Sequence, residues 1–367
     1  MPDPTRAQLV LVEVAAAAVL GGFALGGGWR LAGVAIGAVI ALAAIVPVRS
    51  RWVYQVAGSW VRFVRRRRRG RRGAGLTGLL GEYHVESVPA GTRGGSIGVV
   101  RCGTTWCLPL ALGLDSIFND DPPVPIRLLT DLLRVEDVRL SSVRLFTLTT
   151  PARVAARAPG GPAAPLTPLV ARYCLITLDG RRAADAIAAR GGSQAAVHQI
   201  LRRCAVHAEQ VLSTAGLTVR RLDHAAVASL FATWLGPASE ADGSSPPPAA
   251  ERWRDIEVAG TWSTIFAVTG RGDDVADRVS RLTAAAPTPV AATVLVLRSS
   301  DRHGETGDEV TGTILIRLSA PSAGSHEDTA HSLGLLARAF DLEMQRGDGE
   351  QAELLRATTP IGIGEPA

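Results

Sequence analysis

Residues 8–25 read QLVLVEVAAAAVLGGFAL and residues 31–48 read LAGVAIGAVIALAAIVPV, two apolar runs that decide how the chain is organised. Glu13 is the only charged residue in either run. Eighteen helical residues extend about 27 Å, close to the hydrocarbon thickness of a bilayer. A glycine-rich turn from Gly26 to Arg30 separates the runs, so the sequence predicts a transmembrane helical hairpin.

A dense basic segment follows the hairpin and predicts its orientation. It contains ten arginines and no Asp or Glu: Arg49, Arg51, Arg62, Arg65, Arg66, Arg67, Arg68, Arg69, Arg71 and Arg72. Because basic residues stay on the cytoplasmic side, we expect a two-span protein of the inner (plasma) membrane with both termini cytoplasmic. A cleaved signal peptide is disfavoured, since only Arg6 precedes the first run and a second run follows at once.

The hairpin contains glycines at a spacing that suits helix packing. Gly22 and Gly26 are four residues apart, as are Gly33 and Gly37. Small residues at this spacing let two helix backbones approach closely. These four glycines are the candidate packing residues, and the alternative is that glycine is simply common in this chain.

The segment from Arg51 to Val64 predicts an amphipathic helix or a continuation of the second span. Trp52 and Trp60 are candidate interfacial anchors. The arginines that follow, Arg65, Arg66, Arg67, Arg68, Arg69, Arg71 and Arg72, are candidates for binding anionic lipid headgroups. A solvated charge run and an acidic protein partner are the alternatives.

The charge of the remaining chain argues against nucleic acid as a partner. The whole chain has 39 basic and 34 acidic residues, a net charge of +5. Without the ten arginines of residues 49–72, 29 basic residues face 34 acidic ones, a net charge of −5. A mildly acidic body lacks the basic surface that nucleic-acid binding requires.

Alternating strand and helix patterns predict a membrane-anchored α/β (α+β) protein. We divide the chain into a hairpin (1–48), a juxtamembrane segment and linker (49–81), a first α/β half (82–235), a Pro-rich loop (236–250) and a second half (251–367). Each half reads β-α-β-β-α-β. Within them we expect helices at 126–135, 194–215, 225–235 and 325–344, and a final strand near 354–358.

The search for catalytic, cofactor or metal sites gives no candidate. No phosphate loop is present, because the chain has no lysine. Cys102 and Cys107 have no second matching pair for zinc. The turn Asn119-Asp120-Asp121 supports one alternative function, a membrane-anchored transferase for lipid-linked or nucleotide-sugar substrates. We therefore predict a non-enzyme without cofactors.

Residues 172–193, RYCLITLDGRRAADAIAARGGS, and the following helix and strand resemble the EccE family. EccE is a membrane subunit of the type VII (ESX) secretion systems of actinobacteria. The resemblance at residue level covers about 172–235 and includes no catalytic signature.

The resemblance implies a structural component of a multi-subunit protein-transport complex. Its partners would be EccB, the ATPase EccC and the multispanning EccD. The hairpin and the cytoplasmic domain would stabilise that translocon.

Overall fold

The computed structural model divides the chain into two compact units, Met1–Arg69 and Gly70–Ala367. We call them the N-terminal unit and the sheet unit. The structure describes residues 6–48, 51–70, 75–90, 95–113, 124–150, 169–235, 248–270, 274–286, 290–299 and 310–361.

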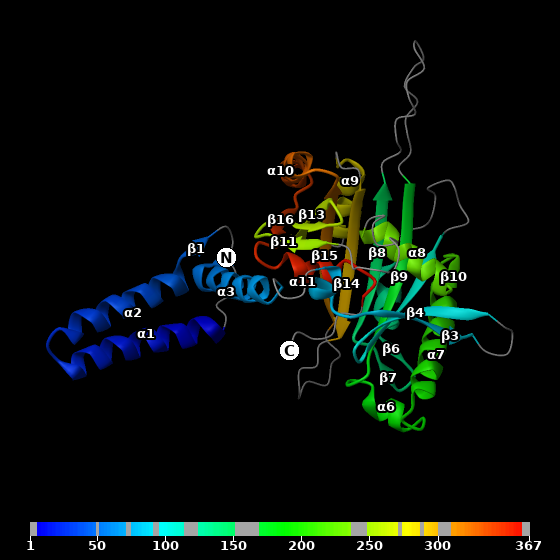
Figure 1. Cartoon of the computed structure of the whole chain (residues 1–367), viewed down its shortest axis with the longest axis horizontal. Helices are drawn as coiled ribbons and strands as arrows, with labels where there is room; N and C mark the ends of the chain where they lie inside the picture. The colour runs from blue at the N-terminus through cyan, green and yellow to red at the C-terminus, as the bar shows by residue number, and fades with distance from the viewer. Residues whose placement is uncertain are drawn as a thin grey trace, which may run out of the picture. The chain divides into compact units, whose positions relative to one another are not determined.

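The N-terminal unit consists of a helical hairpin and a third helix. Helices α1 (Arg6–Leu25) and α2 (Trp29–Ile45) lie side by side (Figure 1). Strands β1 (Pro47–Val48) and β2 (Arg51–Trp52) pair antiparallel, and α3 (Val53–Gly70) follows. The second helix therefore ends at Ile45, before Pro47, and the alternative of a span continuing into the arginines is wrong. Proline cannot supply the N–H that a continuing helix needs.

Helix α1 is long and apolar enough to cross a membrane, with a mean hydropathy of 2.0 over Gln8–Leu25. Helix α2 is also apolar and is shorter, with 17 residues. The second helix is thus shifted toward the N-terminus relative to the apolar run expected at residues 31–48. It begins at Trp29 and ends before Val46.

The sheet unit is built on one antiparallel sheet of twelve strands (Figure 1). Its main path runs β11-β12-β13-β15-β14-β8-β9-β5-β4-β3, with β10 beside β5 and β16 beside β13. The strands are β3 (His84–Pro89), β4 (Ser96–Cys102), β5 (Thr105–Leu112), β8 (Ser142–Thr150), β9 (Leu169–Asp179), β10 (Val219–Arg221), β11 (Ala249–Glu251), β12 (Ile256–Val258), β13 (Thr261–Thr269), β14 (Val290–Ser299), β15 (Val310–Ala320) and β16 (Glu343–Arg346). A separate hairpin pairs β6 (Arg134–Val135) with β7 (Val138–Arg139).

Eight helices of the sheet unit complete the part that the structure describes. They are α4 (Leu76–Leu80), α5 (Ile126–Asp131), α6 (Ala184–Ala188), α7 (Gln194–Ser213), α8 (His224–Leu235), α9 (Val275–Ala284), α10 (Ala323–Ala339) and α11 (Gln351–Ala357).

The same element order occurs twice along the sheet unit. The first half runs β5, α5, β8, β9, α7, β10, and its strands lie in the order β10-β5-β9-β8. The second half runs β13, α9, β14, β15, α10, β16, with the order β16-β13-β15-β14. Strands β8 and β14 pair antiparallel, from Val143 opposite Leu297 to Thr149 opposite Ala291, and this joins the halves into one sheet.

Each face of the sheet has its own apolar core. On one face, α7 buries Val197, Ile200 and Leu201 against the first half, and α9 and α10 cover the second half. The recurrence of buried residues three and four positions apart along α7 explains why this sequence forms a helix with one apolar face. On the other face, α4, α8 and α11 pack on both halves.

Helix α4, which lies within the segment expected as linker up to residue 81, belongs to the sheet unit. Leu76 and Leu80 are buried in the same cluster as α8 and α11. The Arg356 side chain of α11 also donates a hydrogen bond to the Leu79 carbonyl at 2.7 Å. Residues 75–81, predicted as linker, are therefore part of the fold.

Two buried arginines donate hydrogen bonds to backbone carbonyls of the segments that cover the second face of the sheet. Arg144 on β8 donates hydrogen bonds to the carbonyls of Ala357, Thr359 and Ile361, at 3.2, 2.8 and 3.0 Å. Arg317 on β15 donates to the Trp234 carbonyl in the last turn of α8 at 2.9 Å. Burial lowers the pKa of Arg317 to about 10. A cation at a helix C-terminus is favoured by the helix dipole.

Three predicted elements differ from the structure. The helix expected at 325–344 ends at Ala339, and Glu343–Arg346 pairs with β13 as β16. The strand expected near 354–358 is α11. The helix expected at 126–135 ends at Asp131, and Arg134–Val135, at the end of the expected range, form β6.

Candidate membrane and partner-docking sites

The two helices of the hairpin come into backbone contact at Gly22 and Gly33. A Cβ built on Gly33 would lie 2.7 Å from the Gly22 Cα and 2.7 Å from the Ala18 carbonyl oxygen. A Cβ on Gly37 would lie 2.5 Å from the Val19 Cγ2 atom. Distances this short leave no room for a side chain at these positions. Gly22, Gly33 and Gly37 thus face the other helix of the hairpin.

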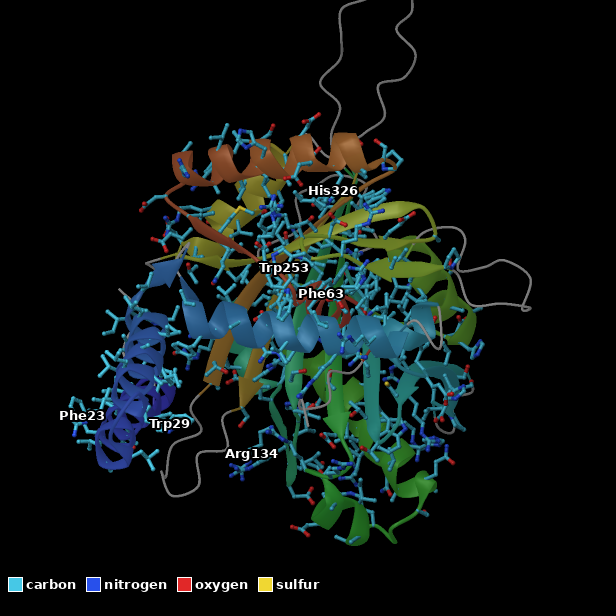
Figure 2. The ribbon with its side chains drawn as sticks, turned by 60° about the vertical axis from the view of Figure 1, so that its left-hand side comes forward. Phe23, Trp29, Phe63, Arg134, Trp253 and His326 are labelled. Carbon is cyan, nitrogen blue, oxygen red and sulfur yellow. The ribbon has the colours of Figure 1, made fainter. Side chains whose placement is uncertain are left out.

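Gly26 differs from the other three glycines. It follows the end of α1, has φ = +70°, and its Cβ would meet nothing within 4 Å. It therefore serves the turn, where a left-handed backbone favours glycine, and not the helix contact. Figure 2 shows Phe23 and Trp29 at this end of the hairpin, where both side chains are exposed.

The two predicted tryptophan anchors lie in different settings. Trp60 on α3 is 57% exposed, and its neighbour Val61 is also exposed. Trp52 lies on β2 and is half-buried. Trp60 thus presents an aromatic surface that a membrane or a partner can cover, whereas Trp52 is partly covered within the structure.

The predicted arginine cluster lies mainly on the last two turns of α3. Arg65, Arg67 and Arg68 are exposed, and Arg66 is half-buried. Arg69 ends the N-terminal unit, and Arg71 and Arg72 lie outside the described residues. Successive residues are rotated by about 100° around the helix axis, so Arg67 and Arg68 flank the side that carries Trp60.

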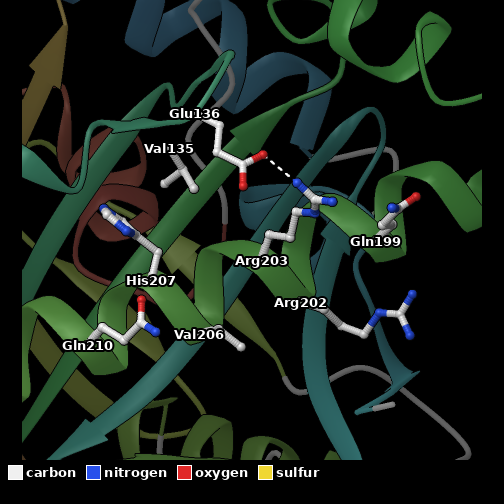
Figure 3. Close-up of a pocket in the computed structure, with 8 residues that line it drawn as sticks. All are labelled: Val135, Glu136, Gln199, Arg202, Arg203, Val206, His207 and Gln210. Atoms are coloured by element: carbon white, nitrogen blue, oxygen red, sulfur yellow. Dashed lines mark hydrogen bonds and ion pairs between the residues drawn. The ribbon is translucent and has the colours of Figure 1, made fainter. Parts of the chain in front are cut away.

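A groove of about 370 Å³ lies along α7 of the sheet unit (Figure 3). Its lining comes from α7 and from the β6–β7 hairpin: Val135, Glu136, Gln199, Arg202, Arg203, Val206, His207 and Gln210. Val206 is 41% exposed and supplies apolar surface. Arg202 makes no ion pair with any residue that the structure describes, and Figure 3 shows its side chain directed away from Glu136.

Ion pairs hold the hairpin end of the groove in place. Arg203 is paired with Glu136, which has φ = +55° between β6 and β7. Arg190 binds the Asp137 carboxylate through both guanidinium nitrogens, at 2.6 and 2.8 Å. The hydrogen bonds from Arg190 lower the pKa of Asp137 to about 2. The β6–β7 turn is therefore fixed to the helices beside it.

The sequence analysis missed this groove. Its members come from two segments more than 60 residues apart, and no spacing rule links Glu136 to Arg203. The one available signal was the exposed side of the 194–215 helix, where Arg202, Val206 and Gln210 recur four residues apart.

The described residues give little support for metal or thiol chemistry. They contain no group of three or more His, Cys, Asp or Glu side chains placed to hold a metal ion. Burial raises the pKa of both Cys174 and Cys204 to about 12, so these thiols stay protonated. Cys102 and Cys107 are free thiols on neighbouring strands.

His326 is a buried structural side chain. Its Nε2 atom lies 2.7 Å from the Thr264 hydroxyl oxygen, which donates its own proton to the Arg254 carbonyl. The imidazole must then donate through Nε2. His331 on the same helix is exposed, so the two do not form a ligand pair. The acidic turn Asn119–Asp121 lies outside the described residues.

Residues 171–268 match a family model described as "Putative type VII ESX secretion system translocon, EccE". The match covers less than half of the chain, and we call residues 171–268 the EccE region after this similarity. The expected resemblance to EccE is thereby confirmed, and it extends beyond the 172–235 on which the expectation rested.

The EccE region contains α7, the helix that lines the groove, and it ends within the pair of strands β12 and β13. It runs from β9 to β13 and includes all of α7 and α8. Both Arg190 and Arg202 therefore lie inside it, whereas Glu136 and the N-terminal unit lie outside. No curated protein matches the chain.

Proposed function

We propose that this protein is a non-enzymatic structural subunit of a type VII secretion membrane complex. The EccE region carries the proposal, because the family that it matches is described as a secretion translocon component.

The hairpin anchors the subunit through two spans. Helix α1 meets the length and hydropathy of a span, and α2 is apolar over all of its length except Arg30. The ten arginines of residues 49–72 support an orientation with both termini on the cytoplasmic side, by the positive-inside rule. Gly22, Gly33 and Gly37 pack the two spans together.

Helix α3 lies at the cytoplasmic membrane surface. Trp60 and Val61 provide exposed apolar surface, while Arg65, Arg67 and Arg68 provide exposed positive charge. Amphipathic helices with this composition bind at the interface of membranes that contain anionic lipids.

The sheet unit is the cytoplasmic part that contacts other subunits. Its EccE region exposes the α7 groove, where Arg202 has no ion pair with a described residue and Val206 supplies apolar surface. Expected neighbours are EccB, the ATPase EccC and the multispanning EccD.

Complementation of a deletion strain tests the function. The full chain restores export of type VII substrates, and a chain lacking residues 1–48 does not, because it loses its anchor. A control with Val39→Ala, at an exposed position on α2, restores export. Normal export in the uncomplemented deletion strain would contradict the proposal.

A further inference from the structure

Glu13 lies on the outer face of α1. Its side chain is exposed and forms no hydrogen bond or ion pair with any residue that the structure describes. Gly22, which packs against α2, is nine residues away and thus about 180° around the helix. Glu13 therefore points away from the other helix of its own hairpin.

The depth of Glu13 makes this exposure costly in a membrane. Glu13 is seven residues after Arg6 and twelve before Leu25, so it lies about 10 Å from one end of α1 and about 18 Å from the other. An ionised side chain in the hydrocarbon core is strongly unfavourable unless another group compensates it. Carboxylates in spans accordingly face protein interiors and pair with cations or other polar groups.

The hairpin itself supplies no cation at that depth among the described residues. Arg30 lies in the first turn of α2, beside the C-terminal end of α1. That end is about 18 Å from Glu13 along the axis, too far for an ion pair. Arg6, at the other end of α1, lies about 10 Å from Glu13 along the axis. No cation of the two helices is level with Glu13, so a compensating group at that depth would belong to another chain.

The surface beside Glu13 permits a close helix approach. Ala16, Ala17 and Leu20 share its side of α1 and are all exposed. A Cβ on the neighbouring Gly21 would meet nothing within 4 Å. Small side chains here let a second backbone come near the carboxylate.

We propose that the Glu13 face of α1 docks against a membrane-spanning helix of another subunit that presents an arginine or lysine to the Glu13 carboxylate. Charge complementarity selects this occupant, because a lipid chain provides neither a cation nor a hydrogen-bond donor. The inference rests on the proposed function, and it names the contact by which the anchor joins the complex.

Photo-crosslinking in native membranes tests the contact. A photoreactive amino acid replaces Ala17 in the full chain, and a matched control replaces Val39, which is exposed on α2. We expect the Ala17 position to form an adduct with a different membrane protein, through a span containing a basic residue. Adducts with lipid alone, or with a second copy of this chain, would overturn the proposal.

Charge variants of Glu13 test the pairing. Glu13→Leu and Glu13→Gln should each lower the yield of the protein adduct about tenfold, a change typical of losing one strong polar contact between spans. An unchanged yield with Glu13→Gln would overturn the ionic contact while leaving the proposed function intact. Absence of the wild-type chain from any secretion complex would overturn both.

Discussion

At the residue scale, the hairpin depends on the absence of side chains at two positions. Gly22 and Gly33 contact each other through backbone atoms, and the sequence spacing alone identified both as candidates. The spacing also selected Gly26, which the structure places in a turn. Spacing identifies a shared helix face but cannot tell where the helix ends.

Gly33→Leu should separate α1 from α2. Its side chain would collide with the Ala18 carbonyl and the Gly22 backbone, neither of which can move without shifting α1. Disulfide trapping between cysteines placed at Gln8 and Ala44, which are hydrogen-bonded across the hairpin at 3.0 Å, measures the separation, and we expect its rate to fall in the variant. Gly21→Leu is the control, because its side chain enters open space; an equal fall there would contradict the model of the contact.

His326 makes the stability of the sheet unit depend on pH. Burial lowers the pKa of His326 below its ordinary value, so the folded state holds the imidazole neutral. The unfolded chain binds a proton below about pH 6.5. The stabilisation is therefore fully present above that pH, and it is lost as pH falls through the lower pKa of the folded state.

Urea unfolding of residues 70–367 at pH about 7.5 and about 5.5 measures this effect. We expect the free energy of unfolding to fall between the two values in the wild type and to fall less in His326→Gln. His331→Gln, at an exposed position on the same helix, should retain the wild-type change. Equal pH dependence in the wild type and His326→Gln would show that another group titrates.

At the element scale, predictions succeeded where local signals were sufficient. Asp223 accepts a hydrogen bond from the Ala226 N–H and so caps α8, which begins within one residue of the expected helix 225–235. Ser193 precedes α7, which begins where the helix 194–215 was expected, but the Ser193 side chain makes no capping hydrogen bond. A residue type predicts where a helix begins more reliably than it predicts the contact made there.

Predictions failed where tertiary contacts decide the element. Residues 343–346 continue a helical pattern in the sequence, yet they form β16 because β13 offers an unpaired edge. Similarly, α4 follows a glycine-rich segment, and only the burial of Leu76 and Leu80 makes it part of the fold. The groove on α7 requires the β6–β7 hairpin, which no local pattern brings to that helix.

Helix α3 should bind anionic membranes through its exposed arginines. In a peptide of residues 51–72, replacing Arg65, Arg67 and Arg68 with glutamine should weaken binding to anionic vesicles by on the order of 1 kcal/mol per arginine. Fluorescence of Trp52 and Trp60, the two tryptophans of the peptide, measures the affinity during titration with vesicles. Trp60→Ala should weaken binding to neutral and anionic vesicles alike. Binding of this variant is measured by the helical signal in circular dichroism.

The vesicle composition separates charge from apolar contact. The arginine replacements should leave binding to neutral vesicles unchanged, because no headgroup charge is present there. An equal loss on neutral and anionic vesicles would contradict the electrostatic role.

At the scale of the whole molecule, the two halves of the sheet unit share one sheet. Strands β8 and β14 pair along most of their length, and Arg144 in the first half holds carbonyls from Ala357 to Ile361 in the second. Each buried carbonyl left without a donor costs about 1–3 kcal/mol. The repeat in the sequence pattern therefore does not produce two independent domains.

We expect residues 70–367 to unfold in a single transition. Tryptophan fluorescence can report each half separately, through Trp106 in the first and Trp262 in the second, after the other tryptophans are replaced with phenylalanine. The two probes should give the same urea midpoint. Residues 82–235 expressed alone should not fold, because β8 and Arg144 lose their partners. Two distinct midpoints would indicate independent halves.

The central claim is that the chain is a subunit of a type VII secretion complex. The most direct measurement is the size of the particle containing the full chain, after gentle solubilisation of native membranes and native electrophoresis. We predict that the chain migrates with the secretion ATPase in one large assembly. Migration only as a free chain, while the ATPase assembly remains intact in the same sample, would contradict the claim.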